Sequence, residues 1–124
     1  MNSLQLQYAI HLIDQGQAAA AAALCHQALA GDPGDPSWNT LLAMSLQHAG
    51  DTAGAAAIYR RLTELQPHES AHWANLGLTL RTLGEHAPAE HAYQQALSLA
   101  PHTYHYLVDY GLLLLDKGDI ARAR

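Results

Sequence analysis

Residues 70–103 read SAHWANLGLTLRTLGEHAPAEHAYQQALSLAPHT, and the pattern of this stretch recurs along the chain at a step of 34 residues. Glycine and proline mark the step most clearly, because both keep their place in successive units. The glycines are Gly16, Gly50, Gly84 and Gly118, and the prolines are Pro33, Pro67 and Pro101. A period of this length predicts a stack of supersecondary units.

Two rows of small residues keep the same step. They are Ala9, Ala43, Gly77 and Gly111, and then Ala21, Ala55, Ala89 and Ala123. Within each unit the apolar residues recur three and four positions apart, which is the spacing of an α-helix. Small residues let two helices approach closely, so we expect Ala9 to meet Ala21 and Gly77 to meet Ala89. The sequence therefore predicts an all-α fold of antiparallel helix pairs.

The glycines and prolines predict where these helices end. Each glycine lies between two helical segments, where a residue free to adopt positive φ can close the first helix. Each proline follows the second segment and cannot continue that helix. Pro88 falls in the first turn of its helix, where its missing N–H has no intrahelical acceptor. Each unit is thus predicted to be helix A, turn, helix B, turn.

Composition limits the function further. A chain of 124 residues with 49% apolar residues is expected to form one domain over residues 1–124, with repeats at 2–35, 36–69, 70–103 and a partial one at 104–124. The formal net charge of -5 argues against nucleic acid as a partner. No secretory signal is visible, and the longest aliphatic run, Leu112 to Leu115, cannot span a membrane. With a single cysteine, we expect a cytoplasmic protein.

The third unit resembles a tetratricopeptide repeat. The matching residues are Trp73, Leu76, Gly77, Leu80, Ala89, Tyr93, Ala96 and Pro101. In the second unit Trp38 stands one place early, and Asn39 occupies the expected slot. The resemblance implies a right-handed superhelical solenoid whose A helices line a concave groove. It also implies a non-catalytic scaffold that binds a peptide or helix of another protein.

The same resemblance implies which residues line the groove. They are Ile10, Thr40, Met44, Gln47, Ala74, Asn75, Leu78, Arg81, Val108, Asp109 and Leu112. One row is apolar in every unit and consists of Ile10, Met44, Leu78 and Leu112. It is expected either to form an apolar stripe on the groove floor or to tighten the packing between neighbouring A helices.

The charges expected in the groove limit the kinds of ligand that it can bind. Relatives that hold the acidic tail of chaperones present several Lys and Arg residues, whereas Arg81 is the only fixed cation expected in this groove. Relatives joined to glycosyltransferases can carry an asparagine ladder, of which only Asn75 is present. Asp14, Asp109 and Asp116 lie nearby, so a neutral to basic amphipathic segment is expected. The alternative is a substrate-recruiting domain of a larger enzyme of the glycosyltransferase or sulfotransferase type.

Residues 68–72, HESAH, match the zinc protease motif H-E-x-x-H. The motif needs both histidines in one helix, whereas His68 directly follows Pro67 and the helix is expected to begin around Ser70. The remaining histidines are expected to be solvated turn residues. The sequence therefore predicts no catalytic residue, no metal site and no cofactor.

The last unit is incomplete. Residues 120–124 supply barely one turn of a fourth helix B, so we expect the chain to be part of a longer protein. Tyr110, Leu113 and Leu114 are then expected to be partly uncovered. An exposed apolar patch favours association, so self-association through this end is also expected.

Overall fold

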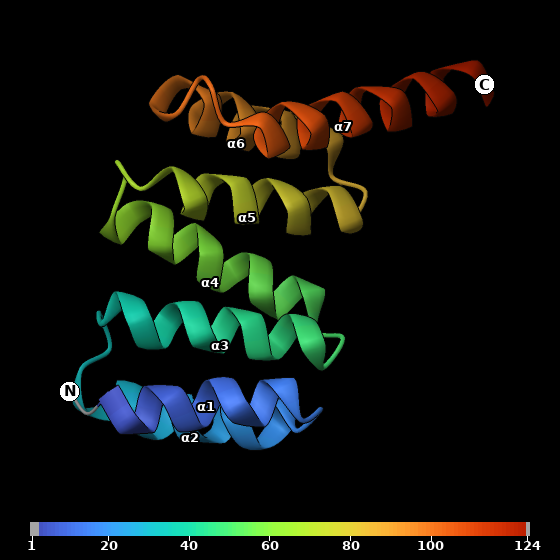
Figure 1. Ribbon diagram of the computed structural model, residues 1–124. Helices are drawn as coiled ribbons and strands as arrows, with labels where there is room; N and C mark the ends of the chain where they lie inside the picture. Colours follow the sequence, from blue (N-terminus) through green and yellow to red (C-terminus); the bar gives the residue numbers. More distant parts are fainter. Residues whose placement is uncertain (1–2, 124) are drawn as a thin grey trace. The chain divides into compact units, whose positions relative to one another are not determined.

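The computed structural model describes residues 3–123 of the chain, with side chains described up to Gly118. Over these residues the chain forms α-helices and no strand (Figure 1). The helices are α1 (Ser3–Asp14), α2 (Ala18–Gly31), α3 (Pro36–His48), α4 (Thr52–Leu65), α5 (Ser70–Thr82), α6 (His86–Leu99) and α7 (Tyr104–Ala123). The predicted all-α repeat architecture is confirmed. None of the described helices is both long enough and apolar enough to cross a membrane.

The helices group into two compact units that divide between Gln66 and Pro67. Unit 1 contains α1 to α4, in which α2 packs against α1 and α3, and α3 packs against α4. Unit 2 contains α5 to α7, in which α6 packs against both α5 and α7. The A helices of the repeats are α1, α3, α5 and α7, and the B helices are α2, α4 and α6. Each A helix that is followed by a B helix runs antiparallel to it, with a short turn between them (Figure 1).

Glycine ends the first helix of three repeats, as predicted. Gly16, Gly50 and Gly84 have φ of 76°, 89° and 79°. The next residue in each case donates its N–H to a carbonyl five positions back, at 2.8 Å, 2.8 Å and 2.9 Å. This is the Schellman arrangement, which gives partners to the last carbonyls of a helix.

The corresponding prediction for Gly118 is wrong. Helix α7 runs without interruption from Tyr104 to Ala123, so no fourth helix B begins after the glycine. In the other repeats a helix of 14 residues follows the turn and packs back on the first helix. Only six residues follow Gly118 in this sequence, too few to gain by packing back, so continued backbone hydrogen bonding is favoured. Arg124 lies outside the described residues.

The core of unit 1 is built around small residues. Ala9 and Ala21 are fully buried where α1 packs on α2. Cys25 is also fully buried, and burial raises the pKa of its thiol to about 11. Between α3 and α4, Ala43, Tyr59 and Leu62 fill the interior. The thiol is therefore uncharged near neutral pH and serves as a packing group.

In unit 2 an aromatic side chain fills the space that the small residues leave. A Cβ atom at Gly77 would lie 3.0 Å from the ring of Tyr93, so this ring fills the space beside the glycine. Helix α7 adds Leu113, which is fully buried, so the prediction that Leu113 is uncovered is wrong. Leu114 is exposed as predicted, and Tyr110 is half-buried. Leu114 is the next residue, so its side chain leaves α7 about 100° further round the helix than that of Leu113.

Candidate peptide-binding surface

The unit 1 face is the exposed side of α1 and α3. It carries Ile10, which is exposed, and Thr40, Met44 and Gln47, which are half-buried. A shallow depression of about 320 Å³ lies between the two helices, lined by Leu6, Ile10, Ser37, Thr40 and Leu41. Most of this lining is aliphatic, so the depression suits an apolar side chain of a ligand.

Internal hydrogen bonds hold the polar residues of this face. Thr40 Oγ1 donates to the Pro36 carbonyl at 2.8 Å, and Gln47 Oε1 accepts from the Tyr59 hydroxyl at 2.9 Å. Neither α1 nor α3 contains a Lys or Arg residue. The unit 1 face therefore carries both apolar and polar side chains, and it has no fixed positive charge.

The unit 2 face is the exposed side of α5 and α7. Leu78, Val108 and Leu112 are exposed, and Asn75, Arg81 and Asp109 are half-buried. Ala74, which the sequence also placed in the groove, is buried with Ala96 and Tyr106 in the core of the unit. Ala74 therefore offers little surface to a ligand.

None of the four residues in the apolar row is buried. Ile10, Leu78 and Leu112 are exposed and Met44 is half-buried. Contact of leucine and isoleucine side chains with water is unfavourable in free energy, and an exposed patch of them is typical of a surface that contacts another molecule. Each member of the row is therefore at least partly accessible to solvent within its own unit.

The lone cation of these faces is already paired. Arg81 Nε lies 2.7 Å from Asp116 Oδ2 on α7. The hydrogen bond raises the pKa of Arg81 and lowers the pKa of the Asp116 carboxyl. Lys117, the one fixed cation among the described side chains of α7, donates to Glu90 on α6. Asp109 stays on the face, so unit 2 offers a ligand more negative than positive charge.

The Tyr93 hydroxyl is a buried polar group of unit 2 that has no hydrogen-bond partner among the described residues. Tyr93 is fully buried and stacks on Tyr110, with ring centroids 6.2 Å apart. Burial, together with the Asp109 charge, raises the pKa of Tyr93 to about 12. The group therefore stays a neutral hydroxyl at physiological pH.

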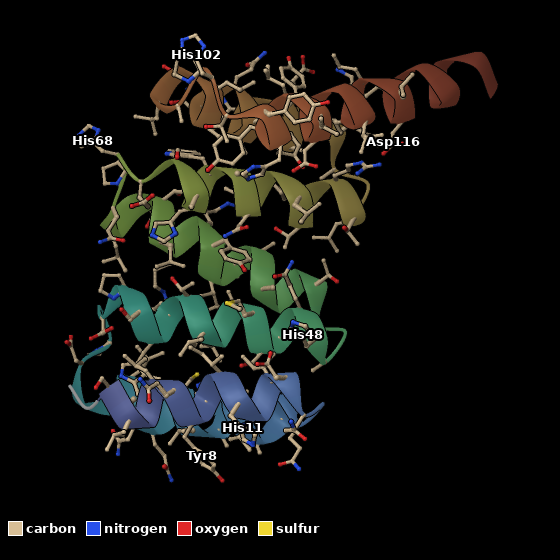
Figure 2. All side chains as sticks on the ribbon, in the orientation of Figure 1. Tyr8, His11, His48, His68, His102 and Asp116 are labelled. Carbon is tan, nitrogen blue, oxygen red and sulfur yellow. The ribbon has the colours of Figure 1, made fainter. Side chains whose placement is uncertain are left out.

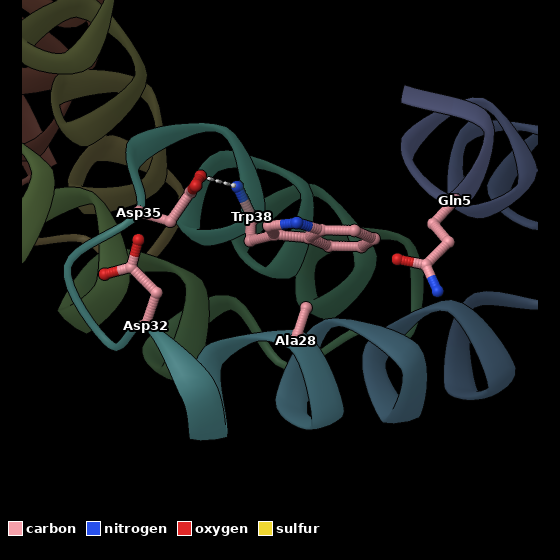
Figure 3. Close-up of a pocket in the computed structure, with 5 residues that line it drawn as sticks. All are labelled: Gln5, Ala28, Asp32, Asp35 and Trp38. Atoms are coloured by element: carbon pink, nitrogen blue, oxygen red, sulfur yellow. Dashed lines mark hydrogen bonds between the residues drawn. The ribbon is translucent and has the colours of Figure 1, made fainter. Parts of the chain in front are cut away.

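A second depression in unit 1 is smaller and more polar. It measures about 200 Å³ and is lined by Gln5, Ala28, Asp32, Asp35 and Trp38 (Figure 3). Asp35 Oδ1 accepts the Trp38 N–H at 3.0 Å and so caps the N-terminus of α3. This carboxylate stabilises the helix start, which explains its burial without a ligand.

The protease-like motif does not form a site. Helix α5 begins at Ser70, as predicted, and His68 lies exposed in the preceding turn (Figure 2). His72 is buried in the first turn of the helix. No three His, Cys, Asp or Glu residues among the described ones are placed to hold a metal ion.

Sequence reasoning missed two features of these faces. Ser37 lines the unit 1 depression and stands one helical turn before Leu41, a spacing that could have revealed it. Arg81 and Asp116, which pair between α5 and α7, are 35 residues apart in sequence. No local signal specifies such a pair.

The fold is shared with several solved structures. The first tetratricopeptide domain of Spaghetti (RPAP3), bound to the HSP90 peptide SRMEEVD, superposes with a TM-score of 0.85 at 16% identity, covering 93% of this chain and 91% of that one. The Sgt2 domain from Aspergillus fumigatus gives 0.88 at 18% identity, with 97% and 81% covered. The Yersinia enterocolitica chaperone SycD, in complex with a peptide of the translocator YopD, gives 0.83 at 17%, with 93% of each chain covered. At these identities the likeness shows the fold alone.

Sequence comparison supports the same assignment. No curated protein sequence matches this chain. Two tetratricopeptide repeat profiles match it, one over residues 12–77 and the other over residues 74–124. Together the two spans cover residues 12–124, which include helices α2 to α7. The chain belongs to the tetratricopeptide repeat family.

Proposed function

We propose that the unit 1 face and the unit 2 face each bind an amphipathic peptide or helix of another protein, and that this ligand is neutral to basic. The observation that carries the proposal is the row Ile10, Met44, Leu78 and Leu112, of which no member is buried. The apolar depression beside Ile10 supplies a place for one side chain of the ligand. Solved relatives of the same fold bind peptides of HSP90, HSP70 and YopD.

Charge favours a neutral to basic ligand over an acidic one. The acidic peptide SRMEEVD is bound by the RPAP3 domain. In this protein the unit 1 face has no Lys or Arg, and Arg81 on the unit 2 face is paired with Asp116 at 2.7 Å. An acidic peptide would have to break that ion pair and approach Asp109. A basic side chain would instead be attracted to Asp109.

A selection from a library of displayed peptides tests this proposal. The wild-type protein is expected to enrich amphipathic peptides with neutral or positive net charge. The double variant Met44→Glu, Leu78→Glu is expected to lose the selected peptides, because each change places a carboxylate in the apolar row.

The matched control is the double variant Leu65→Glu, Leu99→Glu, which changes one exposed leucine on the second helix of a repeat in each unit. It should keep the affinity of the wild type. Enrichment of acidic peptides would contradict the proposed charge preference. Equal binding by both double variants would place the site elsewhere.

A further inference from the structure

One side of α1 is an apolar surface that is not used by the proposed peptide site. Leu4 and Tyr8 are 70% and 57% exposed, and His11 on the same side is exposed as well. Figure 2 shows Tyr8 and His11 on the side of α1 that points away from α3. The residues 34 positions later on α3 are all buried within the protein: Trp38, Leu42 and Ser45. This side of α1 therefore corresponds to a packing face in the next repeat.

One side of α7 is uncovered in a complementary way. Leu107 and Leu114 are 51% and 48% exposed, and a Cβ atom built at Gly111 between them meets nothing within 4 Å. The equivalent residue on α5 is Gly77, where a Cβ atom would lie 3.0 Å from the Tyr93 ring. The space beside Gly77 on α5, which we call the slot, is thus filled by α6. The equivalent slot beside Gly111 on α7 stays open.

The covering helix has a recognisable stripe. Helix α6 presents Ala89, Tyr93 and Ala96, spaced four and three residues apart, and all are essentially fully buried. Helix α1 presents Leu4, Tyr8 and His11 at the same spacing. Both stripes place a tyrosine at the centre, and both lack fixed charge. The α1 stripe therefore has the spacing and the central tyrosine of the α6 stripe, which fills the slot at Gly77.

We propose that α7 of one molecule packs against α1 of a second copy, with the Tyr8 ring over Gly111 as the Tyr93 ring lies over Gly77. The packing is antiparallel, as in the α5 and α6 pair.

This contact is heterologous, because two different surfaces meet. Each molecule that joins leaves one α1 face and one α7 face uncovered at the ends of the assembly. Head-to-tail contacts of this kind produce open chains unless the rotation closes a ring. The inference is independent of the proposed peptide binding, which uses other sides of the same helices.

Sedimentation velocity over a concentration series tests the inference. The wild-type mass is expected to rise with concentration beyond that of a dimer. Tyr8→Glu and Leu114→Glu are each expected to remain monomeric, because a carboxylate in either face would be buried without a partner. The control Leu65→Glu, an exposed leucine on α4, should assemble like the wild type.

Mixing the two variants gives the sharpest result. Tyr8→Glu keeps an intact α7 face and Leu114→Glu keeps an intact α1 face, so an equimolar mixture is expected to form dimers and nothing larger. A monomeric mixture, a wild type whose mass does not change with concentration, or a Tyr8→Glu variant that assembles fully would each overturn the inference.

A third variant tests the inference even if the glutamate variants fail to fold. Gly111→Tyr fills the slot from within the same molecule, and nothing lies within 4 Å to oppose it. We expect this variant to keep its helical circular dichroism and to remain monomeric. Assembly equal to that of the wild type would show that the slot is not the contact.

Discussion

The α3–α4 pair of unit 1 and the α5–α6 pair of unit 2 follow one plan with different side chains. In the first pair the fully buried Asn39 donates from Nδ2 to the carbonyls of Pro33, at 3.0 Å, and Asp35, at 2.9 Å. In the second pair Trp73 occupies the same slot, and its Nε1 donates to the Pro67 carbonyl at 2.9 Å. The shared requirement is therefore a donor that reaches the turn carbonyl, rather than an indole ring.

The central tyrosines of the two pairs, Tyr59 and Tyr93, differ in the hydrogen bonding of their hydroxyl groups. The Tyr59 hydroxyl donates to Gln47 at 2.9 Å, whereas the Tyr93 hydroxyl has no partner among the described residues. The residue that corresponds to Gln47 is Arg81, and it pairs with Asp116. A charge pair with α7 has thus replaced a hydrogen bond within the helix pair.

Helix capping separates the pairs as well. Asp35 and Asp51 accept backbone N–H groups at the starts of α3 and α4. Glu69 and Glu85 precede α5 and α6 and make no such side-chain bond. Apolar packing and glycine turns therefore preserve the backbone of a repeat, while its polar contacts are specific to each copy.

The largest effect is expected from Leu62→Ala in α4. Leu62 is fully buried, and the corresponding residue of α6 is Ala96, so the change gives the first pair the residue of the second. Because the surroundings of Leu62 are built for leucine, we expect the free energy of unfolding to fall by about 3 kcal/mol. Urea denaturation measures this, with the exposed Leu65→Ala as the control. A loss below that of Leu65→Ala would mean that the pairs are interchangeable at this row.

A smaller loss is expected from Asn39→Ala. The change leaves the Pro33 carbonyl without its donor and removes the acceptor of Arg61 Nη1, which lies 3.2 Å from Asn39 Oδ1. Unpaired buried polar groups predict a loss of about 2 kcal/mol in unfolding free energy. Trp73→Phe removes the equivalent, more exposed bond and should cost less. If Asn39→Ala proves harmless, the donor requirement inferred from the comparison is wrong.

The tyrosine hydroxyls provide a matched pair of substitutions. Tyr59→Phe removes the bond to Gln47 and is expected to lower the unfolding free energy by about 1 kcal/mol. Tyr93→Phe removes a buried hydroxyl that has no partner and is expected to be neutral or stabilising. Thermal and urea unfolding of both variants would show the difference. Equal losses would reveal a partner for Tyr93 that the structure does not contain.

The smallest effect is expected from pH. His72 occupies the slot of Trp38, and burial lowers its pKa, an effect that the neighbouring Glu69 partly opposes. An unfolded histidine binds a proton near pH 6.5. The folded state binds it only at lower pH, so unfolding takes up a proton and stability falls as pH drops through that value. His72→Phe should have a flatter pH dependence between pH 7 and 5, and an unchanged slope would contradict this.

Much of the fold could be predicted from the sequence, because it depends on periodic signals. The 34-residue step placed three glycine turns and the start of α5 correctly. The 34-residue step wrongly predicted a helix end at Gly118, where α7 continues. A turn there is stabilised when the segment that follows packs back on the helix. The same step also misjudged Leu113, since the rows did not show which side of α7 packs on α6.

The candidate site could be predicted only in part. The spacing of Ile10, Met44, Leu78 and Leu112 identified a row on the A helices, and no member of it is buried. The burial of Ala74 depends on Tyr106 and Ala96 from two other helices, which spacing alone does not bring together. The partners of Arg81 and Tyr59 follow from the tertiary fold in the same way.

Mapping of a bound peptide by amide chemical shifts in NMR tests the central claim most directly. The probe is the neutral to basic amphipathic peptide with the highest affinity from the displayed library. We predict that the largest shifts fall on α1, α3, α5 and α7, around Ile10, Met44, Leu78 and Leu112. Largest shifts on α2, α4 and α6 instead would contradict the assignment of the binding surface to the A helices.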